Sequence, residues 1–511
     1  MSGEYVAGRY SRGDLLLDCD VVIVGSGAGG AVVALHLAEA GHDVIVLEEG
    51  GRVRPEQYAR MRPSETMRHL WRDSGLSMVL GLGRSPMINL MTGRTVGGSS
   101  VLTGGVCFRI PEAVLDGWVR ERGLSDFTSR RLEPFYQDVE RRCHVSEVPV
   151  HMRSRSTQLF EAGARQLGYG PLQPMHRNTR DCVGWSTCNF GCPAGRKLSV
   201  DVSYLPGAVS AGARVYSDCW VERVEIHGDR AVGVTGRVLE GPHGGAGSRF
   251  KVRARRVVVA CGALHSPRLL VRSGVGRQSR QVGRNLTLHP SFRIMARFDE
   301  RVDGGRGSLQ SAFSSHYEPE GIQLNSVFVP AGILAAAMPG LGDRHRERAS
   351  QMSHLAIFGA NLHDDPGGVV RRGLGREPLV TYHMSDRDQA RLPRALQICA
   401  DTFFAAGARE VFLPVLGLDG LDADSYRRLD LSRLPPRRLE CTSQHPLGTC
   451  RMGVDASRSV VDIEHRAHDV RELYVVDGSA VPTSLGVNPQ LSIMTLATRA
   501  AWCMRERRFL G

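Results

Sequence analysis

Three glycines, Gly25, Gly27 and Gly30, constrain the fold of this chain more than any other feature. They follow an apolar run at residues 20–24, which predicts a buried parallel strand, and they precede a small-residue helix expected over residues 31–40. In this setting the first glycine permits a tight turn, the second lets the backbone approach a pyrophosphate, and the third brings the helix close to the strand. The helix N-terminus then faces the phosphate charge.

The residues after the helix complete a β-α-β unit. Residues 43–47 predict a second buried strand, and Glu48 ends it about 20 residues beyond the last glycine, where an acid binds ribose hydroxyls. A purely structural glycine turn explains the glycines, but it does not explain strand, helix, strand and acid in this order. We therefore expect a dinucleotide site, which would include Ser26 and Ala28 between the glycines. The pattern by itself fits FAD and NAD equally.

Composition excludes several classes of protein. The 511 residues, 42% of them hydrophobic and 23% charged, suit two or three folded domains and not a disordered chain. The net charge is +12, but no dense Lys/Arg tract interleaved with aromatic residues occurs, so we expect no nucleic-acid partner. The sequence has no apolar stretch of about 18 residues and so predicts no membrane span. Residues 1–20 lack a secretory-signal pattern and most cysteines are scattered, which favours a cytoplasmic protein.

Glycine-rich elements recur along the chain and suggest one discontinuous domain. The fingerprint opens the chain, and further glycine-rich turns lie in its middle and near its end. We expect a nucleotide-binding domain assembled from residues 15–115, 200–290 and 440–511. The substrate-binding domain would then comprise residues 116–199 and 291–439.

Five motifs, taken in order, resemble those of the glucose–methanol–choline (GMC) oxidoreductase family. Residues 262–276 match one family signature at every specified position, and residues 93–100 resemble its other glycine-rich signature. The remaining motifs are Val282-Gly283-Arg284-Asn285 with His289-Pro290, the stretch from His445 to Gly453, and the run from Asp477-Gly478-Ser479 to Val487-Asn488-Pro489. Because the similarity extends over about residues 18–505, it covers nearly the whole chain.

The resemblance implies a mixed α/β fold, α+β overall. A Rossmann-like FAD-binding domain of the glutathione-reductase type would carry an inserted substrate domain with an antiparallel sheet. The implied reaction is oxidation of the CH–OH group of a small-molecule alcohol by hydride transfer to flavin N5, with dioxygen or another electron acceptor taking up the electrons. A non-redox lyase that keeps FAD is the alternative within the same family.

The same motifs imply further contacts with FAD. These residues are Gly97, Gly98, Asp477, Gly478, Pro489 and Val221, the last through its backbone to adenine. An acid that follows a buried strand also commonly caps the next element, so Asp477 has a structural alternative. Leu102 stands where some members carry a histidine bonded covalently to flavin, so FAD is expected to be non-covalent. Thr103 replaces the usual Asn or His, which leaves the contact to the flavin ring open.

His445 and Asn488 are the expected catalytic residues. Alcohol oxidation needs a base for the hydroxyl proton, and histidine titrates near the operating pH. Taken alone, His445 in its His-Pro-Leu-Gly turn would only fill that turn; the motif match favours the base. Asn488 precedes Pro489 at the start of a helix expected to reach about Arg507, so it can serve as an N-cap. The resemblance instead gives it a hydrogen bond to the substrate oxygen, and the helix N-terminus can also face the flavin N1–C2 edge.

A run of three cysteines, Cys182, Cys188 and Cys192, followed by proline, is the least expected feature of the sequence. Closely spaced thiolates can ligate an iron–sulfur cluster, and the spacing is similar to that of cluster-containing sugar dehydrogenases of the family. Zinc is disfavoured because no fourth ligand is evident. We favour a loop without metal over a cluster, and a cluster over a disulfide.

Overall fold

The glycine fingerprint forms the β-α-β unit that the sequence predicts. In the computed structural model, which describes residues 3–11, 13–241 and 244–506, β2 (Leu15–Val24) leads through the glycine turn into α1 (Ala28–Glu39) and then to β3 (Val44–Leu47). The last four residues of β2 pair in parallel with β3, and both stretches are almost fully buried. Because both faces of this sheet region are covered, its apolar residues form a continuous run and do not alternate.

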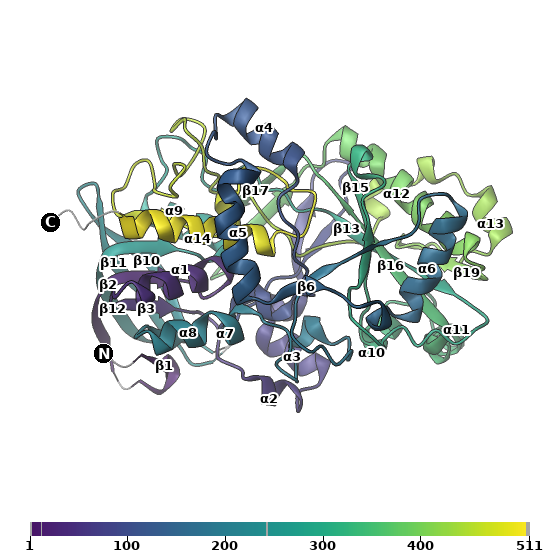
Figure 1. The fold of residues 1–511 in the computed structure, drawn as a ribbon, viewed down its shortest axis with the longest axis horizontal. Helices are drawn as coiled ribbons and strands as arrows, with labels where there is room; N and C mark the ends of the chain where they lie inside the picture. The colour runs from purple at the N-terminus through teal and green to yellow at the C-terminus, as the bar shows by residue number, and fades with distance from the viewer. Residues whose placement is uncertain (1–2, 12, 242–243, 507–511) are drawn as a thin grey trace.

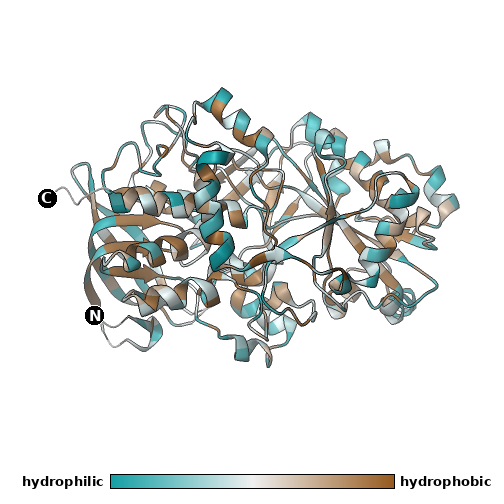
Figure 2. Ribbon diagram, in the orientation of Figure 1, coloured by the Kyte–Doolittle hydropathy of each residue, from teal (hydrophilic) through white to brown (hydrophobic). Residues whose placement is uncertain are grey.

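The first sheet is parallel on one side and antiparallel on the other. Among the described residues its strands run in the order β1 (Glu4–Ala7), β9 (Arg214–Ser217), β3, β2, β12 (Ala246–Val259), β11 (Arg230–Leu239) and β10 (Cys219–His227), and β21 (Leu473–Val475) pairs with β12. The pairings from β1 to β12 are parallel, as is that of β21, whereas β12, β11 and β10 are antiparallel neighbours. Figure 2 shows these strands as largely hydrophobic.

Helices from opposite ends of the sequence pack together beside this sheet. α1 contacts both α8 (Leu205–Ser210) and α14 (Gln490–Glu506), and α14 also contacts α5 (Ser129–Arg142). Both chain termini lie at this end of the molecule (Figure 1). The expected end of the last helix, at about Arg507, lies outside the described residues. This arrangement packs α14, which begins just after Asn488 and Pro489, against the helix that follows the dinucleotide turn.

The second sheet is mostly antiparallel, as the resemblance implies. Within the described ranges its order is β17 (Gly368–Arg371), β18 (Leu379–Tyr382), β4 (Ser77–Gly81), β5 (Ile88–Leu90), β20 (Cys441–Ser443), β13 (Ser291–Arg297), β16 (Leu355–Leu362), β15 (Ile322–Ser326), β14 (Ala312–Ser314) and β7 (Gln173–Pro174), with β19 (Glu410–Phe412) on β13. The β4–β18 and β5–β20 pairings are parallel. α6 (Arg155–Gln166) and α12 (Asp386–Ala405) contact β16. The expected fold class is confirmed.

The two sheets have separate apolar cores. The first core includes Trp118 of α4 (Glu112–Arg122) and Leu132 and Tyr136 of α5, which lie in a stretch that we predicted for the inserted domain. The second core includes residues of β4 and β5, which we predicted for the nucleotide-binding domain. The domain boundaries stay a prediction, because shared packing does not define a unit that folds alone. Among the described helices, none is both long and apolar enough for a membrane crossing.

Candidate active site

A pocket extends from the first sheet to the second and collects most of the predicted site residues. Its cofactor end is formed by Gly25, Gly27, Ala28, Glu48 and Val221. Its substrate end is formed by Ser291, Arg293, Asn325, Asn361, His445 and Asn488. Gly98, Thr103, Asp477, Gly478 and Pro489 also line the pocket. Ser26 and Gly97 hydrogen-bond to each other behind this lining, and a Cβ added at Gly30 would lie 2.0 Å from the carbonyl oxygen of Gly25.

Two glycine-rich turns meet at the cofactor end. Gly25 has a φ of +100°, and a Cβ there would lie 2.3 Å from the carbonyl oxygen of Ala260. Gly98 has a φ of +56°, and a Cβ there would lie 2.8 Å from the Cα of Gly27. No side chain caps α1, whose N-cap is Gly27. The backbone N–H groups at this helix N-terminus are therefore available to a phosphate, as a dinucleotide requires.

Glu48 is fixed at the cofactor end by its hydrogen bonds. Its carboxylate accepts from the backbone N–H of Ser26 at 3.1 Å, from Ser26 Oγ at 2.7 Å and from the N–H of Gly50 at 2.8 Å. Ser26 Oγ also accepts from the N–H of Gly97 at 2.9 Å, which joins the two glycine turns. Burial raises the pKa of Glu48, although these hydrogen bonds oppose the shift. The position suits an acceptor for ribose hydroxyls.

Asp477 joins two of the family-like motifs, the run that begins with Asp477 itself and residues 262–276. Its carboxylate accepts hydrogen bonds from the N–H of Gly262 at 2.8 Å and of Ser479 at 2.7 Å, and from the hydroxyls of Ser266 and Ser479. Burial raises its pKa. Asp477 therefore caps the turn that follows β21 and also lines the pocket, and its contact with the cofactor stays a prediction.

His445 and Asn488 contact each other at the substrate end. Asn488 Nδ2 lies 3.1 Å from His445 Nε2, and the asparagine donates when that ring nitrogen is unprotonated. Burial lowers the pKa of His445 to about 4, so the neutral imidazole is its stable form near neutral pH. Within the described residues, Asn488 Oδ1 is buried without a hydrogen-bond partner. The pair thus presents a proton acceptor next to an amide.

A second histidine supports this pair from behind. The His289 ring packs edge-on against the His445 ring, with centroids 5.4 Å apart. His289 Nε2 accepts from the backbone N–H groups of Leu485 at 3.0 Å and Gly486 at 3.1 Å, on the segment that leads to Asn488. Burial lowers the pKa of His289 well below its usual value. His289 therefore acts as a neutral acceptor that fixes the approach to Asn488.

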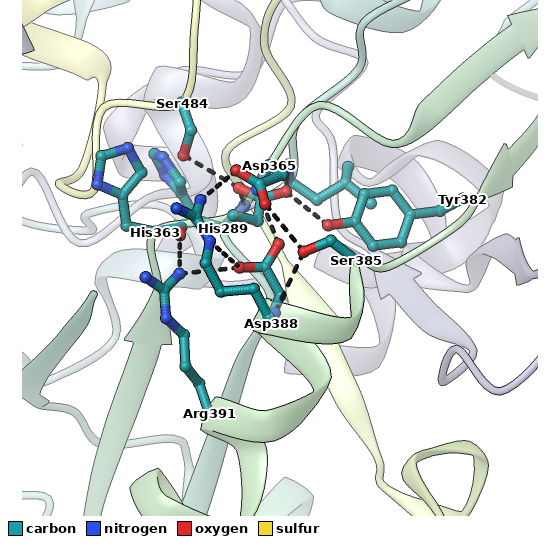
Figure 3. A network of polar contacts seen from close by, with 11 residues as sticks. His289, His363, Asp365, Tyr382, Ser385, Asp388, Arg391 and Ser484 are labelled. Atoms are coloured by element: carbon teal, nitrogen blue, oxygen red, sulfur yellow. Dashed lines mark hydrogen bonds and ion pairs between the residues drawn. The ribbon is translucent and has the colours of Figure 1, made fainter. Parts of the chain in front are cut away.

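Asp364 links the segment that leads to Asn488 with residues 288–289 and with β18 through four hydrogen bonds. It accepts from the backbone N–H groups of Leu288 and His289 and from the hydroxyls of Tyr382 and Ser484, at 2.8 to 3.0 Å. Figure 3 labels three of the residues that contribute these donors, His289, Tyr382 and Ser484. Burial raises the pKa of Asp364 to about 6, against the effect of these donors.

An outer layer of the same network lies at the start of α12. Asp388 accepts from the N–H of Asp365 and from Arg391 Nη1, both at 2.8 Å, and Ser385 Oγ donates to Asp365 at 2.9 Å (Figure 3). Arg391 also donates to the carbonyl oxygen of His363 at 2.9 Å. These bonds tie the turn that carries Asp364 to a long, packed helix.

Thr103 and Leu102 occupy different environments. Thr103 lines the pocket, and its hydroxyl donates to Gln490 Oε1 at 2.9 Å. Leu102 is fully buried in an apolar cluster with Tyr58, Leu70, Trp71 and Val101. A leucine in that position has no atom that can bond to a flavin.

Two of the three clustered cysteines accept hydrogen bonds from the protein. Cys188 Sγ accepts from Arg177 Nη2 at 3.1 Å, and Cys192 Sγ accepts from the backbone N–H groups of Arg196 at 3.3 Å and Lys197 at 3.4 Å. Over residues 3–11, 13–241 and 244–506, no three His, Cys, Asp or Glu side chains form a group that could hold a metal ion. The buried Arg177 lowers the pKa of Cys188, against its burial. The choice between a bare loop and a cluster stays a prediction.

Sequence reasoning missed several residues of the substrate end, above all Arg293, Asn325 and Asn361. They come from β13, β15 and β16, which are distant in sequence and adjacent in the sheet. Alternation over residues 291–297 predicts a half-buried strand with Arg293 on its polar face. It does not show that this face borders a pocket.

The comparisons with known proteins agree with this geometry. Models of the GMC oxidoreductase family match residues 19–291 and 376–497. An uncharacterized GMC-type oxidoreductase of Mycobacterium tuberculosis is 38% identical over 94% of this chain and 75% of its own length. A long-chain-alcohol oxidase of Arabidopsis thaliana is 26% identical over 99% of this chain and 70% of its own. The crystal structure of pyridoxine 4-oxidase from Mesorbium loti superposes with a TM-score of 0.73, at 21% identity, over 96% of this chain and all of that one.

Proposed function

This chain belongs to the GMC oxidoreductase family, and on that basis we propose that it oxidises the CH–OH group of a small-molecule alcohol with FAD as its cofactor. The observation that carries the proposal is the contact between His445 and Asn488, which line the same pocket as the glycine-rich turns of the cofactor end. The long-chain-alcohol oxidase among the relatives is consistent with alcohols as the substrate class.

FAD fits the residues of the cofactor end. The uncapped start of α1 suits the pyrophosphate, Glu48 suits the ribose hydroxyls, and the backbone of Val221 suits adenine. Asp477 and the start of α14 would face the ribityl chain and the flavin. Bound FAD supplies the acceptor for the carbon-bound hydride. Because Leu102 has no bonding atom, we propose that FAD is held non-covalently, so that acid precipitation leaves all flavin in the supernatant; flavin in the pellet would contradict this.

His445 takes the hydroxyl proton in the proposed reaction. Its depressed pKa keeps Nε2 unprotonated and ready to accept, and Asn488 Nδ2 already lies within hydrogen-bond distance of that atom. When the substrate enters, its oxygen takes a place between the two side chains, and Asn488 donates to the oxygen as the proton leaves. Dioxygen or another oxidant then takes up the electrons.

The proposal is tested by mixing the holoenzyme anaerobically with primary alcohols, secondary alcohols, sterols and sugars. We expect at least one class to bleach the visible absorbance of oxidised FAD and to form the corresponding carbonyl compound. A product formed without any change in the flavin spectrum would instead indicate a lyase. Bound FAD that no alcohol reduces would contradict the proposed oxidation.

A further inference from the structure

Arg293 places a positive charge at the substrate end of the pocket. It lies in the middle of β13, directly opposite Gly359 of β16, and a Cβ at Gly359 would lie 3.8 Å from Arg293 Cγ. Phe292, Ile294 and Ala296 on the other face of β13 belong to the second core. Because side chains alternate along a strand, Arg293 points away from that core and lines the pocket with Ser291.

The guanidinium of Arg293 has no anionic partner among the described residues. The hydrogen bond recorded for it runs from Nη1 to Thr442 Oγ1 at 3.4 Å, which is long for an N–H to oxygen bond. Ion pairs are recorded for many arginines of the chain, but none involves Arg293 within the described ranges. Burial lowers its pKa, and no carboxylate opposes that shift.

Two buried arginines of the described chain, in contrast, pair with carboxylates. Arg72 pairs with Glu49 at 2.7 Å and with Glu377 at 2.8 Å. Arg256 pairs with Glu472 at 3.1 Å and also donates to a backbone carbonyl. An enclosed charge without a counter-ion destabilises the fold, whereas a charge that a ligand neutralises contributes to binding. Arg293 thus differs from these two arginines, and a bound anion would supply the counter-ion that it lacks.

The surroundings of Arg293 suit a polar anion better than an alkyl chain. Asn325, Asn361, Gln310 and Gln444 line the same pocket. Asn325 Oδ1 is buried without a partner among the described residues, so it can accept a hydrogen bond from a hydroxyl of such a polar molecule. Thr442, which Arg293 contacts, belongs to β20, the strand that leads directly to His445. An anionic group at Arg293 would therefore belong to the molecule whose hydroxyl reaches His445.

From these observations, and resting on the proposed alcohol oxidation, we infer that the substrate is an alcohol that carries an anionic group, a carboxylate or a phosphate, which Arg293 binds. The planar guanidinium offers two parallel N–H donors that match either group. The anion anchors the substrate on β13 and so presents its CH–OH group to His445 and Asn488. Neutral alcohols lack this anchor, and cationic ones are repelled.

The inference is tested with pairs of alcohols that differ only in charge. The probes are glycolate, lactate and 4-hydroxybutyrate against their amides, and glycerol 3-phosphate against glycerol, each mixed anaerobically with the holoenzyme. We expect the wild type to reduce FAD with one anionic series at a kcat/KM about 100-fold or more above that of its neutral counterparts, as for a desolvated charge pair. The series that reacts distinguishes carboxylate from phosphate.

Arg293→Met should abolish this preference and leave FAD bound. The kcat/KM that Arg293→Met loses with anionic alcohols should be lost mainly through a higher KM. Arg293→Lys should restore part of the preference, because lysine keeps the positive charge but lacks the two parallel N–H donors. Arg297→Met is the matched control, since Arg297 lies on the same face of β13 but pairs with Glu410 at 3.3 Å. Acetate and inorganic phosphate give a readout apart from turnover: one of them should perturb the flavin spectrum of the wild type and of Arg297→Met, but not of Arg293→Met.

Two results would overturn the inference and leave the proposed function intact. One is neutral alcohols reducing FAD as well as their anionic counterparts do. The other is Arg293→Met slowing anionic and neutral alcohols equally, which would assign the charge to the flavin itself. A wild type whose FAD no alcohol reduces, charged or neutral, would overturn the proposed function instead.

Discussion

At the cofactor end of the pocket a ligand meets mostly backbone, whereas at the substrate end it meets side chains. The first depends on glycines such as Gly25 and Gly98, whose missing Cβ atoms allow two turns to touch. The second depends on Arg293, His445 and Asn488, which three separate segments contribute. The backbone geometry is written in short motifs and serves a cofactor common to many enzymes. The side chains at the substrate end, Arg293 above all, are the groups that can select the substrate.

Gly98→Val should have the largest effect on function, because it disrupts the backbone contact at the cofactor end of the pocket. A Cβ at Gly98 would lie 2.8 Å from the Cα of Gly27, and its φ of +56° disfavours a branched side chain. We expect affinity for FAD to fall by about 100-fold or more, giving a colourless protein. Gly41→Ala is the control, since Gly41 also has a positive φ but nothing within 4 Å of the added Cβ. Normal flavin content in Gly98→Val would refute the close-approach argument.

His445→Ala should impair the reaction at the substrate end and leave FAD binding at the cofactor end unchanged. Without the base, we expect flavin reduction by a good substrate to slow by about 10²- to 10⁴-fold, with FAD content unchanged. Anaerobic stopped-flow absorbance measures the rate, and the flavin-to-protein absorbance ratio measures the content. Reduction at near the wild-type rate would remove His445 from the mechanism.

Asp364→Asn should have a smaller effect, because Asp364 acts through the segment that carries Asn488. The NH₂ group of the replacement amide must face two of the four donors, either the His289 N–H with the Ser484 hydroxyl or the Leu288 N–H with the Tyr382 hydroxyl, and that pair must shift. We expect kcat to fall by about 10-fold with little change in KM, as for a small misplacement of reacting groups. Asp388→Asn, one layer further out, should retain most activity. Equal losses in both variants would mean that the network only stabilises the fold.

The difference between the two ends also explains what sequence could predict. Gly25, Gly27 and Glu48 belong to a single β-α-β unit, so the sequence alone predicts that they lie close together. His445 and Asn488 could be proposed as catalytic residues because each lies in a family-like motif. Asp364 sits in a turn that resembles any polar loop, and Arg293 resembles a charge on the outer face of a half-buried strand. Only the pairing of β13 with β16 and β20 brings Arg293 to the pocket.

The smallest expected effect is the response to pH. Burial lowers the pKa of His445 from its usual 6.5 to about 4, so the base stays unprotonated until the solution becomes strongly acidic. We expect kcat/KM for an uncharged alcohol to be nearly constant at neutral and alkaline pH and to fall only as the pH approaches about 4. A decline centred near the usual 6.5 would show that His445 is solvated in the working enzyme.

The most direct test of the account is the stoichiometry of a single anaerobic turnover. The wild-type holoenzyme is mixed with an excess of a reactive alcohol, and the loss of oxidised FAD absorbance is compared with the carbonyl compound formed. If both ends of the pocket act on one reaction, each FAD that is bleached accompanies one molecule of aldehyde or ketone, and His445→Ala slows both together. Carbonyl formation in excess of bleached FAD, or bleaching without a carbonyl product, would contradict the account.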